Sequence, residues 1–125
     1  MTDNKTPRQK LGQKGEDLAA AYLEENGIRV LERNYHFMKA EIDIIAYNGR
    51  QIIFVEVKTR TKTYFGNPEE AVTKKKKESM YQAAEAWLYE RKMDGAPVRF
   101  DIISVVMKPN SPPEITHFEA AFWHL

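Results

Sequence analysis

Residues 41–58 read EIDIIAYNGRQIIFVEVK, two runs rich in isoleucine and valine on either side of Asn48-Gly49. An Asn-Gly pair between alternating apolar runs is the strongest short-range signal for a β-hairpin with a two-residue turn, because both turn residues need a positive φ. We therefore predict two antiparallel strands in which Tyr47 pairs with Arg50.

This register divides the side chains of the hairpin between two faces, because directly opposed residues share a face and side chains alternate along each strand. Asp43 is predicted opposite Phe54, and Glu41 opposite Glu56. One face then carries Glu41, Asp43, Phe54, Glu56 and Lys58. The other face is wholly apolar and should be core, with Ile42, Ile44, Ala46, Ile53, Val55 and Val57.

Carboxylates on neighbouring strands indicate a compensating cation. Two of them about 4 Å apart repel by roughly 1 kcal/mol in water and about 4 kcal/mol at the effective dielectric of a protein surface. Asp43 lies diagonally across from Glu56 in the predicted hairpin, within reach of a shared Mg²⁺ or Mn²⁺ ion. Lys58 is placed to orient an attacking water or to stabilise charge on a phosphate. This equipment is typical of a metal-dependent phosphodiesterase.

A second interpretation of the same face is an ordinary solvated surface with ion pairs, since antiparallel sheets often leave one side wet. An isolated E-x-K on a strand favours that interpretation, because glutamate and lysine are common surface residues. The additional carboxylates on the same face of the hairpin favour a metal site. They do not by themselves exclude the solvated surface.

The remaining elements follow from periodicity, caps and turn residues. A second helix begins either after a cap at Thr73 or earlier, with Asn67 as cap and Pro68 at its first position. The predicted order is a helix at 10–26, strands at 28–37, 41–47 and 50–59, the second helix to about residue 92, a strand at 98–107 and a short strand at 114–119. This order predicts an α/β fold in which a mixed sheet is flanked by helices.

Composition limits the class of protein. The chain has 125 residues, 42% of them hydrophobic, which is enough for one core. We expect a flexible leader at 1–9 and a single domain at 10–125. The absence of cysteine excludes thiolate nucleophiles and cysteine-ligated zinc. No run is apolar enough to span a membrane and the start is not signal-like, so we expect a cytoplasmic protein.

The hairpin resembles a known family. The runs AEIDIIA at 40–46 and FVEVKTR at 54–60 look like the signature of the YraN-like family of small uncharacterised bacterial proteins. That family is similar to archaeal Holliday junction resolvases and other PD-(D/E)xK nucleases. The likeness covers nearly the whole chain, through Gly15-Glu16, Phe65-Gly66, Pro68, Glu70-Ala71-Val72 and Arg99-Phe100-Asp101. One departure is Ala40, which stands where the family usually has glycine.

The resemblance implies a restriction-endonuclease-like core. It makes Glu16 the acidic residue of the first helix, Asp43 and Glu56 the ligands of Mg²⁺ or Mn²⁺, and Lys58 the catalytic lysine. It also implies a homodimer, because resolvases cut two strands symmetrically, although no segment of the sequence identifies an interface.

Local clusters of positive charge are the candidates for contacts with nucleic acid, since the net charge is only +1. The lysine run 74–77 falls in the first turn of the second helix, where the macrodipole disfavours cations and favours a bound anion. We expect these side chains to contact backbone phosphates of DNA, and they are Arg60, Lys62, Lys74, Lys75, Lys76 and Lys77. A solvated lysine cluster is the equally weighted alternative. Tyr64 and Phe65 either stack on an unpaired base or pack their own loop.

The leading hypothesis from the sequence is a metal-dependent endonuclease-like protein that hydrolyses DNA phosphodiesters, with branched or processed DNA as the substrate class. The alternative is a nucleic-acid-binding module that keeps the nuclease fold without cleaving. A third class, an interaction protein with an acidic face, is disfavoured by the neighbouring lysines.

Overall fold

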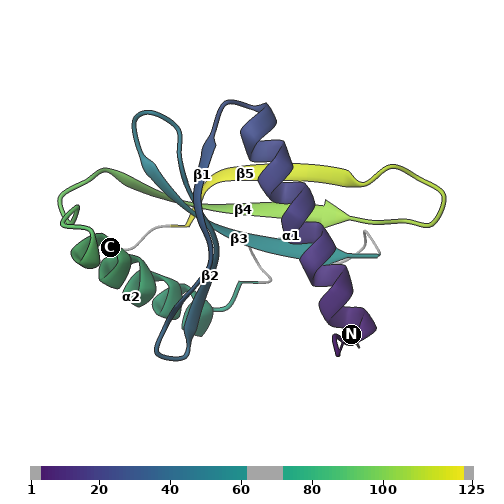
Figure 1. The fold of residues 1–125 in the computed structure, drawn as a ribbon, viewed down its shortest axis with the longest axis horizontal. Helices are drawn as coiled ribbons and strands as arrows, with labels where there is room; N and C mark the ends of the chain where they lie inside the picture. Colours follow the sequence, from purple (N-terminus) through teal and green to yellow (C-terminus); the bar gives the residue numbers. More distant parts are fainter. Residues whose placement is uncertain (1–3, 62–71, 123–125) are drawn as a thin grey trace.

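The computed structural model describes residues 4–61 and 72–122, in which two helices flank a five-stranded sheet (Figure 1). The elements are α1 (Pro7–Glu25), β1 (Arg29–Phe37), β2 (Ala40–Tyr47), β3 (Ile52–Arg60), α2 (Lys74–Glu90), β4 (Val98–Val106) and β5 (Glu114–Phe122). The strands lie in the sheet in chain order. β3 and β4 are parallel because α2 crosses between them, and the other neighbours are antiparallel. The predicted mixed α/β architecture is confirmed.

Helix α1 begins at Pro7, three residues before the predicted start, because Thr6 forms a complete capping box. The Thr6 hydroxyl accepts from the backbone N–H of Gln9, and the Gln9 side chain accepts from the backbone N–H of Thr6. The predicted C-terminal glycine is confirmed: Gly27 has a φ of 77° and follows the last turn, which closes with a hydrogen bond from Ile28 N to Leu23 O.

Helix α2 begins at Lys74 with Thr73 as its cap, since the Thr73 hydroxyl accepts from the backbone N–H of Lys76. The competing cap, Asn67 with Pro68, lies outside the described residues. All five residues of the predicted apolar stripe are buried, namely Met80, Ala83, Ala84, Trp87 and Leu88. Neither helix of the described chain has the length and apolar character to cross a membrane.

The predicted register of the hairpin is wrong by two residues. Tyr47 pairs with Ile52 rather than with Arg50. The loop is longer because the Asn48 side chain accepts hydrogen bonds from the backbone N–H groups of Arg50 and Gln51. Of the two predicted turn residues, Asn48 and Gly49, only Gly49 has a positive φ, 94°. The predicted two-residue turn needs a positive φ at both positions and therefore does not form.

The corrected register replaces the predicted pairs of Asp43 with Phe54 and of Glu41 with Glu56. Phe54 pairs with Ile45, and the regular β2–β3 ladder stops at Ile44 and Val55. A shift of two residues preserves the alternation of side chains, because the period of a strand is two. The predicted grouping of residues by face therefore survives in most positions.

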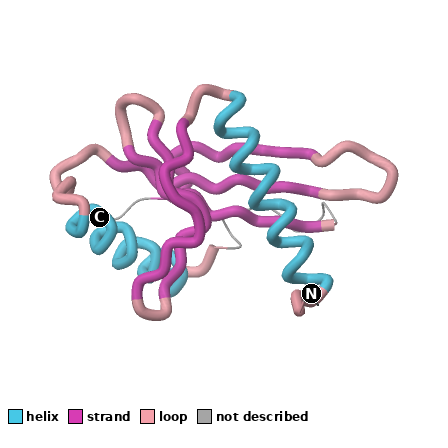
Figure 2. The backbone as a smooth tube through the Cα atoms, viewed as in Figure 1, coloured by secondary structure: helices cyan, strands magenta, loops and turns pink. Residues whose placement is uncertain are grey.

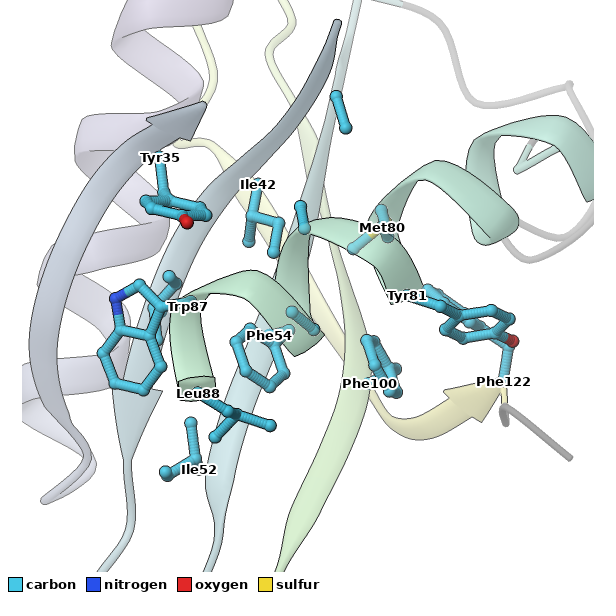
Figure 3. Packing of buried hydrophobic residues seen from close by; sticks show 14 of the residues in the cluster. Tyr35, Ile42, Ile52, Phe54, Met80, Tyr81, Trp87, Leu88, Phe100 and Phe122 are labelled. Atoms are coloured by element: carbon cyan, nitrogen blue, oxygen red, sulfur yellow. The ribbon is translucent and has the colours of Figure 1, made fainter. Parts of the chain in front are cut away.

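Both faces of the sheet are covered. On one face α1 closes a cluster of Ala19, Leu23, Ile44, Ala46, Ile53, Val55, Ile103 and Val105. On the other face α2 packs over a larger cluster that includes Tyr35, Phe54, Trp87 and Phe100 (Figure 3). Ile42 belongs to this second cluster, so its predicted place beside Ile44 is wrong. The alternation of β2 is interrupted between these two isoleucines, at Asp43.

The first two strands curve together away from β3, β4 and β5 (Figure 2). The curvature coincides with a bulge in β1 between Val30 and Glu32 and with a positive φ of 54° at Asn34. Because β2 bends, its N-terminal half separates from β3. This separation makes room for polar side chains at the edge of the core.

Candidate functional site

A pocket of about 370 Å³ lies between α1 and the separating strands β2 and β3. Four of its lining residues are the predicted catalytic set: Glu16, Asp43, Glu56 and Lys58. The other lining residues are Arg8, Leu11, Gly12, Val57 and Thr59. The structure thus brings together an acid from α1, an acid from β2, and an acid and an amine from β3.

Asp43 lies where the β2–β3 ladder ends. Its Oδ2 accepts a hydrogen bond of 2.8 Å from the backbone N–H of Val57, so the side chain bonds to β3 where strand pairing has stopped. Burial, followed by the charge of Glu56, raises the pKa of Asp43 to about 7. The contribution of Glu56 arises because two carboxylates that line one pocket repel each other when both are charged.

Glu56 is buried, with 6% of its surface exposed. Its Oε1 is 3.8 Å from the Lys58 amine and its Oε2 is 3.4 Å from the Lys76 amine. Burial raises the pKa of Glu56 despite these two cations. Among the described residues, Oε2 has no hydrogen-bond partner, so the Lys76 contact supplies opposite charge without hydrogen-bond geometry.

Glu16 is held in place by β1. Its Oε1 accepts hydrogen bonds from Arg33 Nε at 3.0 Å and from Asn34 Nδ2 at 2.9 Å. The positive φ of Asn34 interrupts the alternation of β1, and consecutive residues thereby reach the same carboxylate. Glu16 is 8% exposed and lines the pocket. Its carboxylate is therefore oriented before any ligand binds.

The predicted contacts with nucleic acid separate into different environments. Lys74 and Lys75 are exposed on the first turn of α2. Lys76 points back to Glu56, and the Lys77 amine lies 5.6 Å from the centre of the Phe122 ring. Arg60 is half-buried at the end of β3. Lys62, Tyr64 and Phe65 lie outside the described residues.

The donor set of the pocket fits a hard divalent cation. Among the described residues, no group of three or more His, Cys, Asp or Glu side chains is arranged to hold a metal ion. Mg²⁺ does not need such a group, because it typically binds one or two carboxylates and keeps several waters. Asp43 and Glu56 supply two carboxylates. The buried Oε2 of Glu56 has no hydrogen-bond donor in the part of the chain that the structure describes, so a cation would satisfy it.

Sequence reasoning missed the groups that surround the four predicted residues. Arg8 lines the pocket, and Arg33 and Asn34 orient Glu16. Lys76 was predicted to contact a phosphate, and its contact with Glu56 was not predicted. The contact of Lys76 with Glu56 depends on how the first turn of α2 packs against the sheet. No sequence signal indicated that Arg33 and Asn34 contact Glu16, since this contact depends on the local break in the alternation of β1.

Comparison with known proteins identifies relatives over nearly the full chain. Residues 15–105 match the model of the uncharacterised protein family UPF0102. A UPF0102 protein of Geotalea daltonii is 45% identical over 120 residues, which cover 96% of this chain and 91% of the relative. A UPF0102 protein of Nocardia farcinica is 41% identical, and the match covers 92% of this chain and 91% of the relative.

Among solved structures, the chain is similar to Hjc of Archaeoglobus fulgidus, a Holliday junction resolvase from an archaeal hyperthermophile. The TM-score is 0.47 and the sequence identity is 19%, over 86% of this chain and 81% of the other.

Proposed function

Since the chain belongs to the uncharacterised protein family UPF0102, whose name assigns no activity, we propose from its own site that it is a metal-dependent nuclease acting on DNA. The observation that carries the proposal is the convergence of Glu16, Asp43, Glu56 and Lys58 on one pocket. Three buried or half-buried acids beside an amine are unfavourable for stability alone, and they suit phosphodiester hydrolysis.

Each residue has a distinct role in this proposal. Asp43 and Glu56 hold Mg²⁺ or Mn²⁺, which supplies Lewis-acid chemistry at a phosphoryl oxygen when bound. Lys58 stabilises the negative charge that develops on the phosphate as water adds to phosphorus and one P–O bond breaks. Glu16, oriented by Arg33 and Asn34, lies at the helix side of the pocket and positions the attacking water.

The surroundings of the pocket support a polyanionic substrate. Arg8 lines the pocket, and the exposed amines of Lys74 and Lys75 lie on the same first turn of α2 as Lys76. We propose that these groups, with Arg60, Lys62 and Lys77, contact backbone phosphates. The proposal includes branched or processed DNA as substrate, a homodimer that cuts two strands, and action in the cytoplasm.

Metal binding is the first experiment. A cation that binds only the folded state raises the unfolding free energy by about 2.7 kcal/mol at 100 times its Kd, or the Tm by roughly 10 °C for a domain of this size. We expect Mn²⁺ to produce a rise of this order in the native protein and little change in Asp43→Asn and Glu56→Gln. Glu114→Gln removes an exposed carboxylate in β5 and should respond like the native protein. Equal responses from all four proteins would remove the metal site.

Cleavage is the second experiment. The native protein with Mn²⁺ is incubated with linear, flapped and four-way DNA, and Lys58→Ala is expected to cut about 100- to 1000-fold more slowly because it lacks the charge that stabilises the phosphate. Cleavage at an unchanged rate in Lys58→Ala would indicate a contaminating nuclease. DNA binding without cleavage by the metal-loaded native protein would favour the alternative, a nucleic-acid-binding module.

A further inference from the structure

Lys76 occupies an unusual position for a lysine in the first turn of a helix. Its amine lies 3.4 Å from Glu56 Oε2 and 3.4 Å from the backbone carbonyl oxygen of Glu41. The side chain is 33% exposed, so it reaches from the surface of α2 to a glutamate whose own side chain is 8% exposed. Lys76 is therefore the one described residue of α2 that contacts a predicted metal ligand through an ion pair.

The contact between Lys76 and Glu56 is loose. Charge-assisted hydrogen bonds between an amine and a carboxylate are usually about 2.7–2.9 Å long. Here the separation is 3.4 Å, and none of the residues at 4–61 and 72–122 donates a hydrogen bond to the buried Oε2. The Lys76 amine thus offsets the charge of Glu56 without a hydrogen bond to Oε2. This arrangement is expected if the amine can be exchanged for a cation that binds the carboxylate more tightly.

The metal-free protein needs such a cation. A buried carboxylate without a nearby positive charge is strongly unfavourable, and Lys58 lies 3.8 Å away on the other oxygen. Lysine suits a temporary role because its amine sits on a flexible four-carbon stem. The backbone of Lys76 is fixed by the hydrogen bond to the Thr73 hydroxyl, so the amine can leave Glu56 while the helix stays in place.

We propose that Lys76 is an exchangeable counter-ion of the site: its amine pairs with Glu56 in the metal-free protein, and a divalent cation displaces it toward the substrate phosphate. This inference rests on the proposed metal site and adds a competition between two cations for one carboxylate. Because the amine returns when the metal leaves, the site is protected from the repulsion of its own acids.

Calorimetric titration with Mn²⁺ tests the competition. Lys76→Met removes the amine and keeps the length of the side chain, so Mn²⁺ should bind about tenfold more tightly than to the native protein, because no ion pair has to be displaced. Lys75→Met is the matched control, since it removes the same charge from an exposed neighbour in the same turn. Its affinity should lie within about twofold of native, because exposed charges are screened. If Lys76→Met does not fold, Lys76→Gln makes the same test with a polar side chain.

Pulse labelling of lysines with an amine-reactive reagent tests the displacement directly. Mn²⁺ should increase the labelling of Lys76 in the native protein and leave that of Lys75 unchanged. In Asp43→Asn, which lacks a ligand of the proposed metal, Mn²⁺ should alter neither residue. A lysine with a purely structural role would not respond to the metal at all.

The outcomes separate the two proposals. If the native protein binds Mn²⁺ but Lys76→Met has native affinity and Lys76 labelling stays constant, the counter-ion role is wrong and the metal site stands. If only Lys76→Met binds Mn²⁺, the counter-ion role is supported in its strongest form. If neither protein binds Mn²⁺, both proposals fall together.

Discussion

Asp101 is fully buried and Asp43 is half-buried, and their surroundings shift their pKa values in opposite directions. Burial acts to raise the pKa of Asp101, but hydrogen bonds from His117, Arg99 and the Ala120 N–H hold it below its ordinary value of 3.8. Asp43 receives one backbone hydrogen bond, and burial followed by the charge of Glu56 raises its pKa to about 7. Asp101 therefore stabilises the fold, whereas the charged form of Asp43 destabilises it.

Replacement of Asp101 should therefore destabilise the protein. Asp101→Asn leaves Arg99 and His117 without their buried charged partner, which we expect to lower the unfolding free energy by about 3–5 kcal/mol at neutral pH. Glu119→Gln, which removes an exposed partner of Arg99, should cost less than about 1 kcal/mol. Urea unfolding measures both. Similar losses in the two variants would contradict the role of Asp101.

The stability difference between the native protein and Asp101→Asn should depend on pH. Because the folded-state pKa of Asp101 lies below 3.8, its contribution is complete above that pH and is lost as the pH falls through the folded-state value. The stability gap between the native protein and Asp101→Asn should thus be widest near neutral pH and should narrow below about pH 4. A gap that is constant with pH would show that Asp101 acts through packing alone.

For Asp43 the sign is reversed. A carboxyl group whose folded-state pKa is raised from 3.8 to about 7 destabilises the fold increasingly as the pH rises between those values. In the absence of metal, Asp43→Asn should be more stable than the native protein by about 1–3 kcal/mol near pH 8, because asparagine can still accept from Val57 N–H without the charge. The gain should vanish near pH 4 and be reversed by Mn²⁺ at pH 8, as measured by urea unfolding. A native protein as stable as the variant at pH 8 would contradict a raised pKa at Asp43.

At the scale of elements, the approach of α1 to β3 sets the width of the pocket. A Cβ atom added at Gly15 would lie 1.9 Å from the Thr59 side-chain oxygen, whereas a Cβ at Gly12 would meet nothing within 4 Å. Gly15 directly precedes Glu16, so only glycine there lets the helix bring this acid to the sheet. The spacing of the helix from β3 is therefore a requirement of the site.

Two identical substitutions in α1 test this requirement. Gly15→Ala should lower the unfolding free energy by about 1–3 kcal/mol through overpacking. Gly12→Ala should raise it by up to about 1 kcal/mol, because alanine favours a helix over glycine and the space is open. Thermal unfolding compares them. Equal effects would mean that the close contact with Thr59 relaxes without cost.

The hairpin shows which features of an element can be predicted from the sequence and which cannot. The grouping of Asp43, Glu56 and Lys58 was predicted from a register that was wrong by two residues, and it survived because that shift preserves alternation. The break that moves Ile42 to the α2 face could not be predicted, since it arises where β2 leaves β3. The contact of Lys76 with Glu56 depends on how α2 docks, which no periodicity encodes.

At the scale of the whole molecule, charge is separated although the net charge is only +1. Arg8 and Lys76, in the first turns of α1 and α2, and Lys58, in β3, lie around the candidate site. Near the other end of α2, a hollow of about 590 Å³ is lined by Glu85, Glu90 and Asp94 with apolar neighbours. We expect a polyanion to approach the end of the molecule that carries the candidate site, because local clusters of positive charge act there in place of a high net charge.

The salt dependence of DNA binding tests this polarity. If Lys75 contacts a phosphate, Lys75→Gln should weaken binding about equally across DNA sequences and reduce the slope of log K against log salt by about 1. Lys108→Gln removes the same charge beyond β4, where Lys108 pairs with Glu114, and should leave the slope at its native value. Fluorescence anisotropy with labelled duplex DNA at several salt concentrations measures both slopes. If the two variants lose equal slope, binding responds to total charge; if neither does, the first turn of α2 does not face the DNA.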